Sequence, residues 1–192
     1  MNLPNKLTLL RVFMVPVFLL MMYLDIPFNL FWALVIFAAA SITDAVDGHL
    51  ARKHNLVTNF GKFMDPLADK VLVTSALICF LEMGYMGKFA AVAVIIIIAR
   101  EFAVSGLRLI TAGEGVVVAA GIWGKLKTAA TMVTIVCILA MQGIIKEFDI
   151  SASLCDTFNI IGIVLIWVCT VLTVFSGYTY INAYKGYINP KD

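Results

Sequence analysis

Residues 44–69 read DAVDGHLARKHNLVTNFGKFMDPLAD and place four carboxylates where two apolar blocks of the chain meet. Asp44 and Asp47 are three residues apart, and Asp65 and Asp69 are four apart, so on helices each pair shares one face. Neighbouring carboxylates beside a membrane are costly unless they are solvated, paired with cations or bound to metal. Because their oxygens suit hard divalent cations, the stretch predicts a paired Mg²⁺ or Mn²⁺ site at the ends of a helical hairpin.

The rest of the chain is dominated by apolar blocks long enough to cross a bilayer. Of its 192 residues, 62% are hydrophobic and only 14% are charged, whereas a soluble domain carries about a quarter charged residues. We predict an all-α integral membrane bundle of six transmembrane helices that forms one domain over residues 1–192. Its expected partners include membrane lipids but no nucleic acid. The approximate spans are residues 7–24, 29–52, 62–82, 88–110, 125–145 and 157–183.

A short polar segment precedes the first block. Pro4 together with Asn2 or Asn5 predicts a short N-terminal interfacial helix that lies along the lipid headgroups. Two interpretations stay open for Lys6 and Arg11, which either bind anionic lipids at the surface or contribute to the functional site.

The cations predict the orientation of the chain in its membrane. With the N-terminus inside, all but Lys88 and Lys146 of the 14 Lys and Arg residues fall on one side. Because cytoplasmic loops carry an excess of these residues, we predict that both termini and residues 44–69 face the cytoplasm. Four tyrosines near the end of the chain are interpreted as an interfacial aromatic belt on that side: Tyr178, Tyr180, Tyr184 and Tyr187.

Other interpretations of the four carboxylates explain less. Helix caps and ion-pair partners in solvated loops account for one or two of them. A divalent-cation or proton transporter is the serious alternative from another class, since intramembrane carboxylates also mark ion routes. Against a transporter, the four acids gather at one surface and no ladder of acids crosses the membrane. A purely structural membrane protein has no need of four aligned aspartates.

The residues around the aspartates suit a phosphate ester. Gly48, Ala51 and Gly61 leave room for a ligand or a close helix contact, and Arg52 adds a guanidinium that binds phosphate oxygens. Metal ions would neutralise a pyrophosphate, while a carboxylate outside the tightest coordination accepts a proton from an attacking hydroxyl. The stretch therefore favours transfer chemistry on a lipid phosphate.

The pattern Asp44-x2-Asp47-Gly48-x2-Ala51-Arg52-x8-Gly61-x3-Asp65-x3-Asp69 resembles, at every defined position, the signature of the CDP-alcohol phosphatidyltransferase family. The resemblance implies a homodimeric six-helix membrane enzyme in which an alcohol displaces CMP from a CDP-activated lipid. It also implies that the four aspartates bind the metal ions and that Asp69 is the general base. The residues assigned on this resemblance to the CDP-lipid site are Asp47, Gly48, Ala51, Arg52 and Gly61, with Asn5 and Thr8 from the N-terminal segment.

A second group of polar residues lies in the fourth and fifth blocks. Arg100, Ser105 and Arg108 fall close to one helical face, and Arg100 lies too deep in its block for a casual surface charge. Glu101 is expected to pair with a neighbouring cation. Lys125 and Lys127 add two cations at the start of the fifth block, either for the same site or for positive-inside anchoring. This excess of cations predicts an acceptor alcohol that carries its own phosphate.

Three segments are similar to the phosphatidylglycerophosphate synthase branch of the family: Pro4-Asn5-x-Leu7-Thr8-x2-Arg11, residues 100–108 and residues 124–128. This similarity implies that CDP-diacylglycerol and sn-glycerol 3-phosphate give phosphatidylglycerophosphate and CMP at a bacterial cytoplasmic membrane. The acceptor's phosphate is assigned to Arg100, Ser105, Arg108, Lys125 and Lys127. Inositol phosphate, serine or phosphatidylglycerol remains the alternative acceptor.

Overall fold

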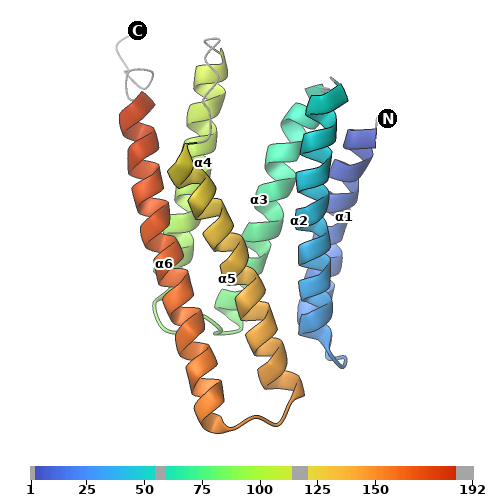
Figure 1. Ribbon diagram of the computed structural model, residues 1–192, viewed down its shortest axis with the longest axis vertical. Coiled ribbons are helices and arrows are strands. Elements are labelled where there is room, and N and C mark those ends of the chain that lie inside the picture. Colours follow the sequence, from blue (N-terminus) through green and yellow to red (C-terminus); the bar gives the residue numbers. More distant parts are fainter. Residues whose placement is uncertain (1–2, 55–58, 114–120, 185–192) are drawn as a thin grey trace. The chain divides into compact units, whose positions relative to one another are not determined.

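Long helices make up the chain, as the apolar blocks predict. The computed structural model describes residues 3–54, 59–113 and 121–184, without the side chains of residues 3–7, 44–54, 59–69, 109, 112 and 113. Within these ranges there is no strand (Figure 1). Because lipid offers the backbone no hydrogen bonds, each helix satisfies its own peptide groups. The helices are α1 (Leu3–Tyr23), α2 (Asn29–His54), α3 (Asn59–Glu82), α4 (Ala90–Gly113), α5 (Ile122–Glu147) and α6 (Ala152–Tyr184).

The six predicted spans each correspond to one of these helices, and the differences lie at the ends. The expected interfacial segment is not a separate helix, because α1 runs without a break from Leu3 and contains Pro16. α2 ends at His54 rather than residue 52, α3 begins at Asn59 rather than residue 62, and α6 begins at Ala152 rather than near residue 157. The all-α fold class is confirmed, and the described residues contain the six predicted helices.

The surface of the helices is apolar, as lipid contact requires. Within the described part of the chain, three helical segments are long and apolar enough to cross a membrane: Ala90–Arg108, Ile122–Glu147 and Ala152–Tyr184. Large apolar side chains such as Phe13, Ile95 and Val171 lie mostly exposed on the outer faces, where water would make them an aggregation liability. The chain is therefore a multi-pass membrane protein.

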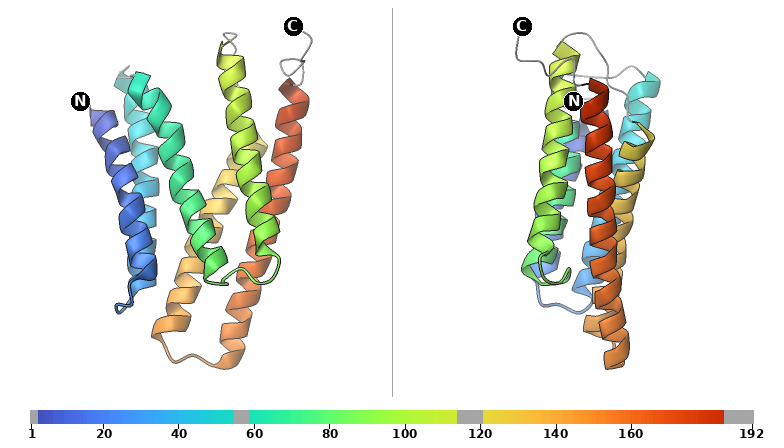
Figure 2. Two further views of the ribbon diagram at one scale, coloured as in Figure 1. Left: turned by 180° about the vertical axis from the view of Figure 1, so that it is seen from behind. Right: turned by 90° about the vertical axis from the view of Figure 1, so that its left-hand side faces the viewer.

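The helices group into two compact units, and α5 and α6 contribute to both. The first unit contains α1, α2 and α3 with residues 135–147 and 152–158. In it α1 packs against α2 and α3, which the views of Figures 1 and 2 show side by side. A buried stripe at helical spacing faces inward from α1, with Phe18 packed on Phe37 of α2 at 6.1 Å between ring centroids. The stripe consists of Thr8, Arg11, Val15, Phe18 and Met22.

Polar contacts close the first unit at the turn between α1 and α2. The buried Asn29 begins α2, and its side-chain amide donates to the Met21 carbonyl. Lys146 of α5 lies 3.0 Å from Asp25 and 3.1 Å from the Asn29 side-chain oxygen. Glu147 accepts a hydrogen bond of 2.8 Å from the backbone N–H of Phe28, which has a positive φ of 58°. These contacts attach the end of α5 to the turn.

The second unit contains α4, the first part of α5 and most of α6. It comprises residues 84–113, 121–134 and 159–184 among those described. Along α6 the buried positions repeat every three or four residues and are mainly small or polar: Gly162, Ile166, Cys169, Thr170, Thr173, Ser176, Gly177 and Tyr180. Such small and hydroxyl side chains allow helices to approach closely in a membrane. This face of α6 holds the polar network described below.

Candidate functional site

The aspartate stretch occupies the predicted place in the first unit. Residues 44–54 form the last turns of α2 and residues 59–69 the first turns of α3, so the two halves of the motif lie at the adjoining ends of neighbouring helices (Figure 1). The side chains of the assigned residues there lie outside the described part of the chain: Asp44, Asp47, Gly48, Ala51, Arg52, Gly61, Asp65 and Asp69, and also Asn5. Among the side chains that are described, no cluster of His, Cys, Asp and Glu can hold a metal ion. The metal site stays a prediction.

Two residues of α1 that the sequence analysis singled out, Thr8 and Arg11, have described side chains, and both are buried. Thr8 and Arg11 are each about 1% exposed and begin the inward stripe of α1. A guanidinium this deeply buried does not reach lipid headgroups. The interpretation of Arg11 as a surface anchor for anionic lipids is therefore wrong, and Arg11 belongs to the interior of the first unit.

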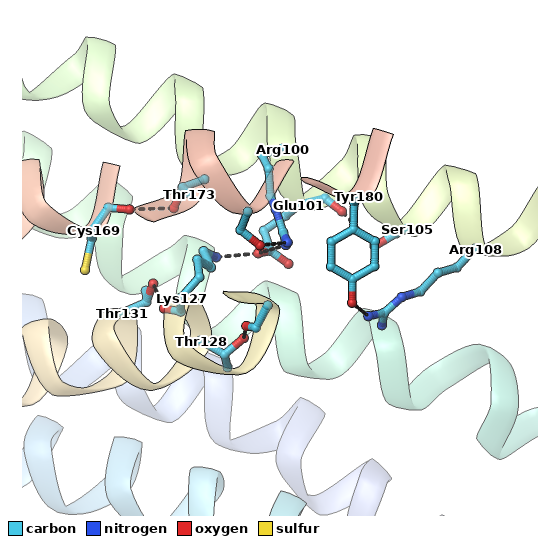
Figure 3. A network of polar contacts seen from close by, with 12 residues as sticks. Arg100, Glu101, Ser105, Arg108, Lys127, Thr128, Thr131, Cys169, Thr173 and Tyr180 are labelled. Carbon is cyan, nitrogen blue, oxygen red and sulfur yellow. Dashed lines mark hydrogen bonds and ion pairs between the residues drawn. The ribbon is translucent and has the colours of Figure 1, made fainter. Parts of the chain in front are cut away.

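In the second unit, α4 presents its charged residues to α5 and α6 (Figure 3). Arg100 donates from Nη2 to the Ser176 hydroxyl at 2.5 Å and from Nη1 to Glu101 at 3.3 Å. Glu101 is also ion-paired with Lys127 of α5, whose side chain is only 3% exposed. The predicted pairing of Glu101 with a cation is confirmed, and the carboxylate is shared by two cations.

Lys125 and Lys127, which the sequence analysis could not distinguish, differ in burial in the structure. Lys127 is buried beside Glu101, so it does not act as a positively charged anchor at the membrane surface. Lys125, two residues earlier on α5, is exposed. Ser105 donates its hydroxyl to the Glu101 carbonyl at 2.7 Å, a bond within α4 itself. Of the residues assigned to the acceptor, the structure thus draws Arg100 and Lys127 together through Glu101, and leaves Lys125 outside this network.

Arg108 completes the network through a residue that the sequence interpretation missed. Its Nη2 donates to the Tyr180 hydroxyl oxygen at 2.9 Å, and both Arg108 and Arg100 lie over the Tyr180 ring, with guanidinium carbons 5.5 and 5.4 Å from the centroid. Tyr180 is 5% exposed. The belt interpretation is therefore wrong for Tyr180, although it suits the exposed Tyr178. The available signal was the helical spacing of Tyr180 from Ser176 and Thr173.

The network carries more positive than negative charge. Among the described side chains it contains three cations, Arg100, Arg108 and Lys127, and one carboxylate, Glu101. Buried charges of one sign are costly unless a partner of the opposite sign is present. Arg100 and Lys127 are largely buried around Glu101, while Arg108 is exposed. This surplus of cations suits an anionic ligand, and guanidinium groups match phosphate oxygens well.

Comparisons with known proteins agree with these features. A family model described as CDP-alcohol phosphatidyltransferase matches residues 1–175. A Bacillus subtilis protein named CDP-diacylglycerol–glycerol-3-phosphate 3-phosphatidyltransferase is 42% identical over 193 residues, which cover 94% of each chain. Proteins of the same name from Rickettsia bellii and Haemophilus influenzae are 37% and 36% identical over 187 residues, covering 97% and 96% of this chain and 97% and 94% of theirs.

Proposed function

The chain belongs to the CDP-alcohol phosphatidyltransferase family, and from this premise we propose that it transfers the phosphatidyl group of CDP-diacylglycerol to sn-glycerol 3-phosphate and releases CMP. The proposal rests above all on the 36–42% identity to relatives of that name over nearly their full lengths. The surplus of cations in the second unit supports an acceptor that carries a phosphate. None of the matched relatives reported above is named as an ion transporter, so the transporter alternative has no support.

The donor side of the reaction is assigned to the aspartate stretch. Asp44 and Asp47 at the end of α2, with Asp65 and Asp69 at the start of α3, offer hard oxygen ligands that fit two Mg²⁺ or Mn²⁺ ions. Bound metal ions would neutralise the negative charge of the pyrophosphate. Arg52 binds the phosphates from the protein side, while Gly48 and Ala51 leave space for the nucleotide, and Asn5, Thr8 and Gly61 complete the CDP-lipid site.

The transfer step needs one base. The Asp69 carboxylate takes the proton from a hydroxyl of glycerol 3-phosphate, and the hydroxyl oxygen attacks the phosphorus that carries the diacylglycerol. A new oxygen–phosphorus bond forms, the bond from that phosphorus to the bridging oxygen breaks, and CMP leaves with the electron pair. Arg100, Arg108, Ser105, Lys125 and Lys127 bind the acceptor's own phosphate.

The location of the enzyme follows from its charges. The Lys and Arg distribution supports a bacterial cytoplasmic membrane with both termini and the site on the cytoplasmic side. There the nucleotide enters from the cytoplasm while the acyl chains remain in the bilayer. The family resemblance supports a homodimer.

The first experiment measures CMP release from CDP-diacylglycerol by the purified protein, with and without glycerol 3-phosphate and with and without a chelator. We expect release that requires both the acceptor and a divalent ion. Release that prefers serine, which has no phosphate, contradicts the acceptor assignment, and release that survives the chelator contradicts the metal assignment.

The second experiment replaces the proposed base. Asp69→Asn should lower CMP release by at least about 100-fold, since a positioned general base contributes that much or more. Asp25→Asn is the matched control, because Asp25 is 95% exposed on the turn between α1 and α2 and should retain activity. Thermal unfolding in detergent checks that both variants are folded, and activity of folded Asp69→Asn near that of the unchanged protein rules out the mechanism.

A further inference from the structure

Tyr180, near the end of α6, contacts the two other helices of the second unit. It contacts Arg100 and Arg108 of α4, Gly121 and Gly124 at the beginning of α5, and Tyr184 one turn further on α6. Its neighbour Tyr178, two residues earlier, is 67% exposed. The contrast indicates a specific task for Tyr180 rather than a general affinity for the membrane interface.

The phenol oxygen links α4 to the start of α5. It accepts hydrogen bonds from Arg108 Nη2 at 2.9 Å and from the Gly121 backbone N–H at 3.1 Å. Gly121 directly precedes α5, and its carbonyl accepts the first helical bonds, from the N–H groups of Gly124 and Lys125. One oxygen therefore fixes a guanidinium of α4 relative to the turn of α5 that carries Lys125.

The ring holds two cations without cancelling their charge. Both guanidinium carbons lie within 5.5 Å of the ring centroid, where the ring's negative face attracts a cation. A carboxylate in this position would also hold Arg108, but it would neutralise the charge that an anionic ligand requires. Glu101 does this for Lys127. An aromatic hydroxyl keeps Arg108 in place and leaves its positive charge available.

Gly124 leaves the space that the ring occupies. A Cβ atom at this position would lie 3.1 Å from Cε2 and 3.2 Å from the hydroxyl oxygen of Tyr180. These distances are tighter than ordinary van der Waals contact, and a buried ring has little room to retreat. The first turn of α5 is thus fitted to Tyr180 by shape as well as by the hydrogen bond to Gly121.

We propose that Tyr180 is a positioning residue for the acceptor: it fixes Arg108, Arg100 and the start of α5 in the arrangement that binds the phosphate of glycerol 3-phosphate. This proposal rests on the proposed function of the chain. Tyr180 acts through the guanidinium groups, whose donors must be preorganised to bind a phosphate at little entropic cost. It therefore affects the binding of the acceptor and leaves the transfer step unchanged.

Tyr180→Phe tests the proposal because it keeps the ring and removes the hydroxyl. We expect the KM for glycerol 3-phosphate to rise about tenfold, as for the loss of one hydrogen bond to a charged group. The kcat at saturating acceptor and the KM for CDP-diacylglycerol should stay within about twofold, because the donor side is untouched. Tyr178→Phe, which changes an exposed tyrosine on the same helix, should alter none of these values.

A purely structural role predicts another result. A lower kcat with an unchanged KM for glycerol 3-phosphate means fewer active molecules and overturns the proposal, as does a Tyr180→Phe variant identical to the unchanged protein. Gly124→Ala provides a second test, since it crowds the ring but keeps the hydroxyl. It should raise the same KM by a smaller factor, and an unchanged KM in that folded variant also counts against the proposal.

The failure of this proposal differs from a failure of the proposed function. If the unchanged protein releases no CMP in response to glycerol 3-phosphate, the function is wrong and the Tyr180 assignment falls with it. If the unchanged protein is active and only Tyr180→Phe lacks the expected KM change, the function stands and the positioning role alone is refuted. Comparison with glycerol, an acceptor without phosphate, adds a direct readout: Tyr180→Phe should lower the preference for glycerol 3-phosphate over glycerol.

Discussion

In the first unit, Lys146 pairs with Asp25 while Glu147 caps the backbone of Phe28, whereas in the second unit a single carboxylate, Glu101, serves both Arg100 and Lys127. The pair in the first unit is open to solvent, with Asp25 95% and Lys146 39% exposed. In the network of the second unit Lys127 and Arg100 are largely buried, with side chains 3% and 11% exposed, while Arg108 is exposed, and cations outnumber anions among the described side chains. The solvated ion pair attaches a helix end to a turn and contributes little free energy. Buried cations that outnumber their carboxylate partner are destabilising unless an anion binds to them.

The comparison also shows how surplus charge is kept in place. Arg108 is held by the ring and hydroxyl of Tyr180, which are neutral, so its charge is not cancelled by these contacts. Lys127 is held by Glu101 and is largely neutralised. Both cations are proposed to bind the acceptor's phosphate, but Lys127 is already ion-paired with Glu101, whereas the described contacts of Arg108 are to neutral groups.

The largest expected effect comes from removing the shared carboxylate. Glu101→Gln leaves the buried Lys127 without its negative partner and should lower the free energy of unfolding by about 3–5 kcal/mol, measured by thermal or denaturant unfolding in detergent. Lys127→Met should cost less, because Glu101 keeps Arg100. The double variant Glu101→Gln/Lys127→Met should recover part of the loss. Equal stability of Glu101→Gln and the unchanged protein would refute this account of the network.

A smaller effect, on binding rather than folding, is expected from Arg108→Gln. It removes a charge-assisted contact to the acceptor's phosphate, worth roughly 1.5–3 kcal/mol, so the KM for glycerol 3-phosphate should rise at least tenfold in steady-state CMP release. Lys88→Gln is the control for a change in net charge alone, because Lys88 is an exposed cation just before α4 and is predicted on the other side of the membrane. If both variants raise the KM equally, a general surface charge and not a built site attracts the acceptor.

The smallest effect is expected in the first unit. Asp25→Asn breaks the exposed pair with Lys146 and should change the free energy of unfolding by no more than about 1 kcal/mol, since solvated ion pairs contribute little. The Asn29 side-chain oxygen still accepts from Lys146 at 3.1 Å. A loss as large as that of Glu101→Gln, in the same unfolding assay, would remove the distinction between the two units.

Much of the fold could be predicted from the sequence, because bilayer thickness fixes the length of an apolar helix. All six predicted spans overlap the observed helices, and the aspartate motif falls on the adjoining ends of α2 and α3, as its position between two apolar blocks required. The helix ends were less well predicted. Polar residues such as Lys53 and His54 continue α2, since helices end where hydrogen bonding and packing end, not where the chain ceases to be apolar.

The candidate site was only partly predictable. The charge of Arg100 inside an apolar block and the need of Glu101 for a cation were apparent from the sequence. Tyr180 was not, because a tyrosine near a helix end suits both an interfacial belt and a buried contact. Lys125 and Lys127 likewise could not be told apart, and only the face that α5 turns toward Glu101 makes one exposed and the other buried.

The sequence by itself determined six apolar helices, their family signature and the presence of surplus cations on α4 and at the start of α5. Only the tertiary structure decided which cation is neutralised and which is held by a neutral ring. The physical reason is that helical periodicity describes one face of one helix, while these contacts join residues far apart in the chain, 26 positions for Lys127 and Glu101 and 72 for Arg108 and Tyr180. Partners at such distances are chosen by packing.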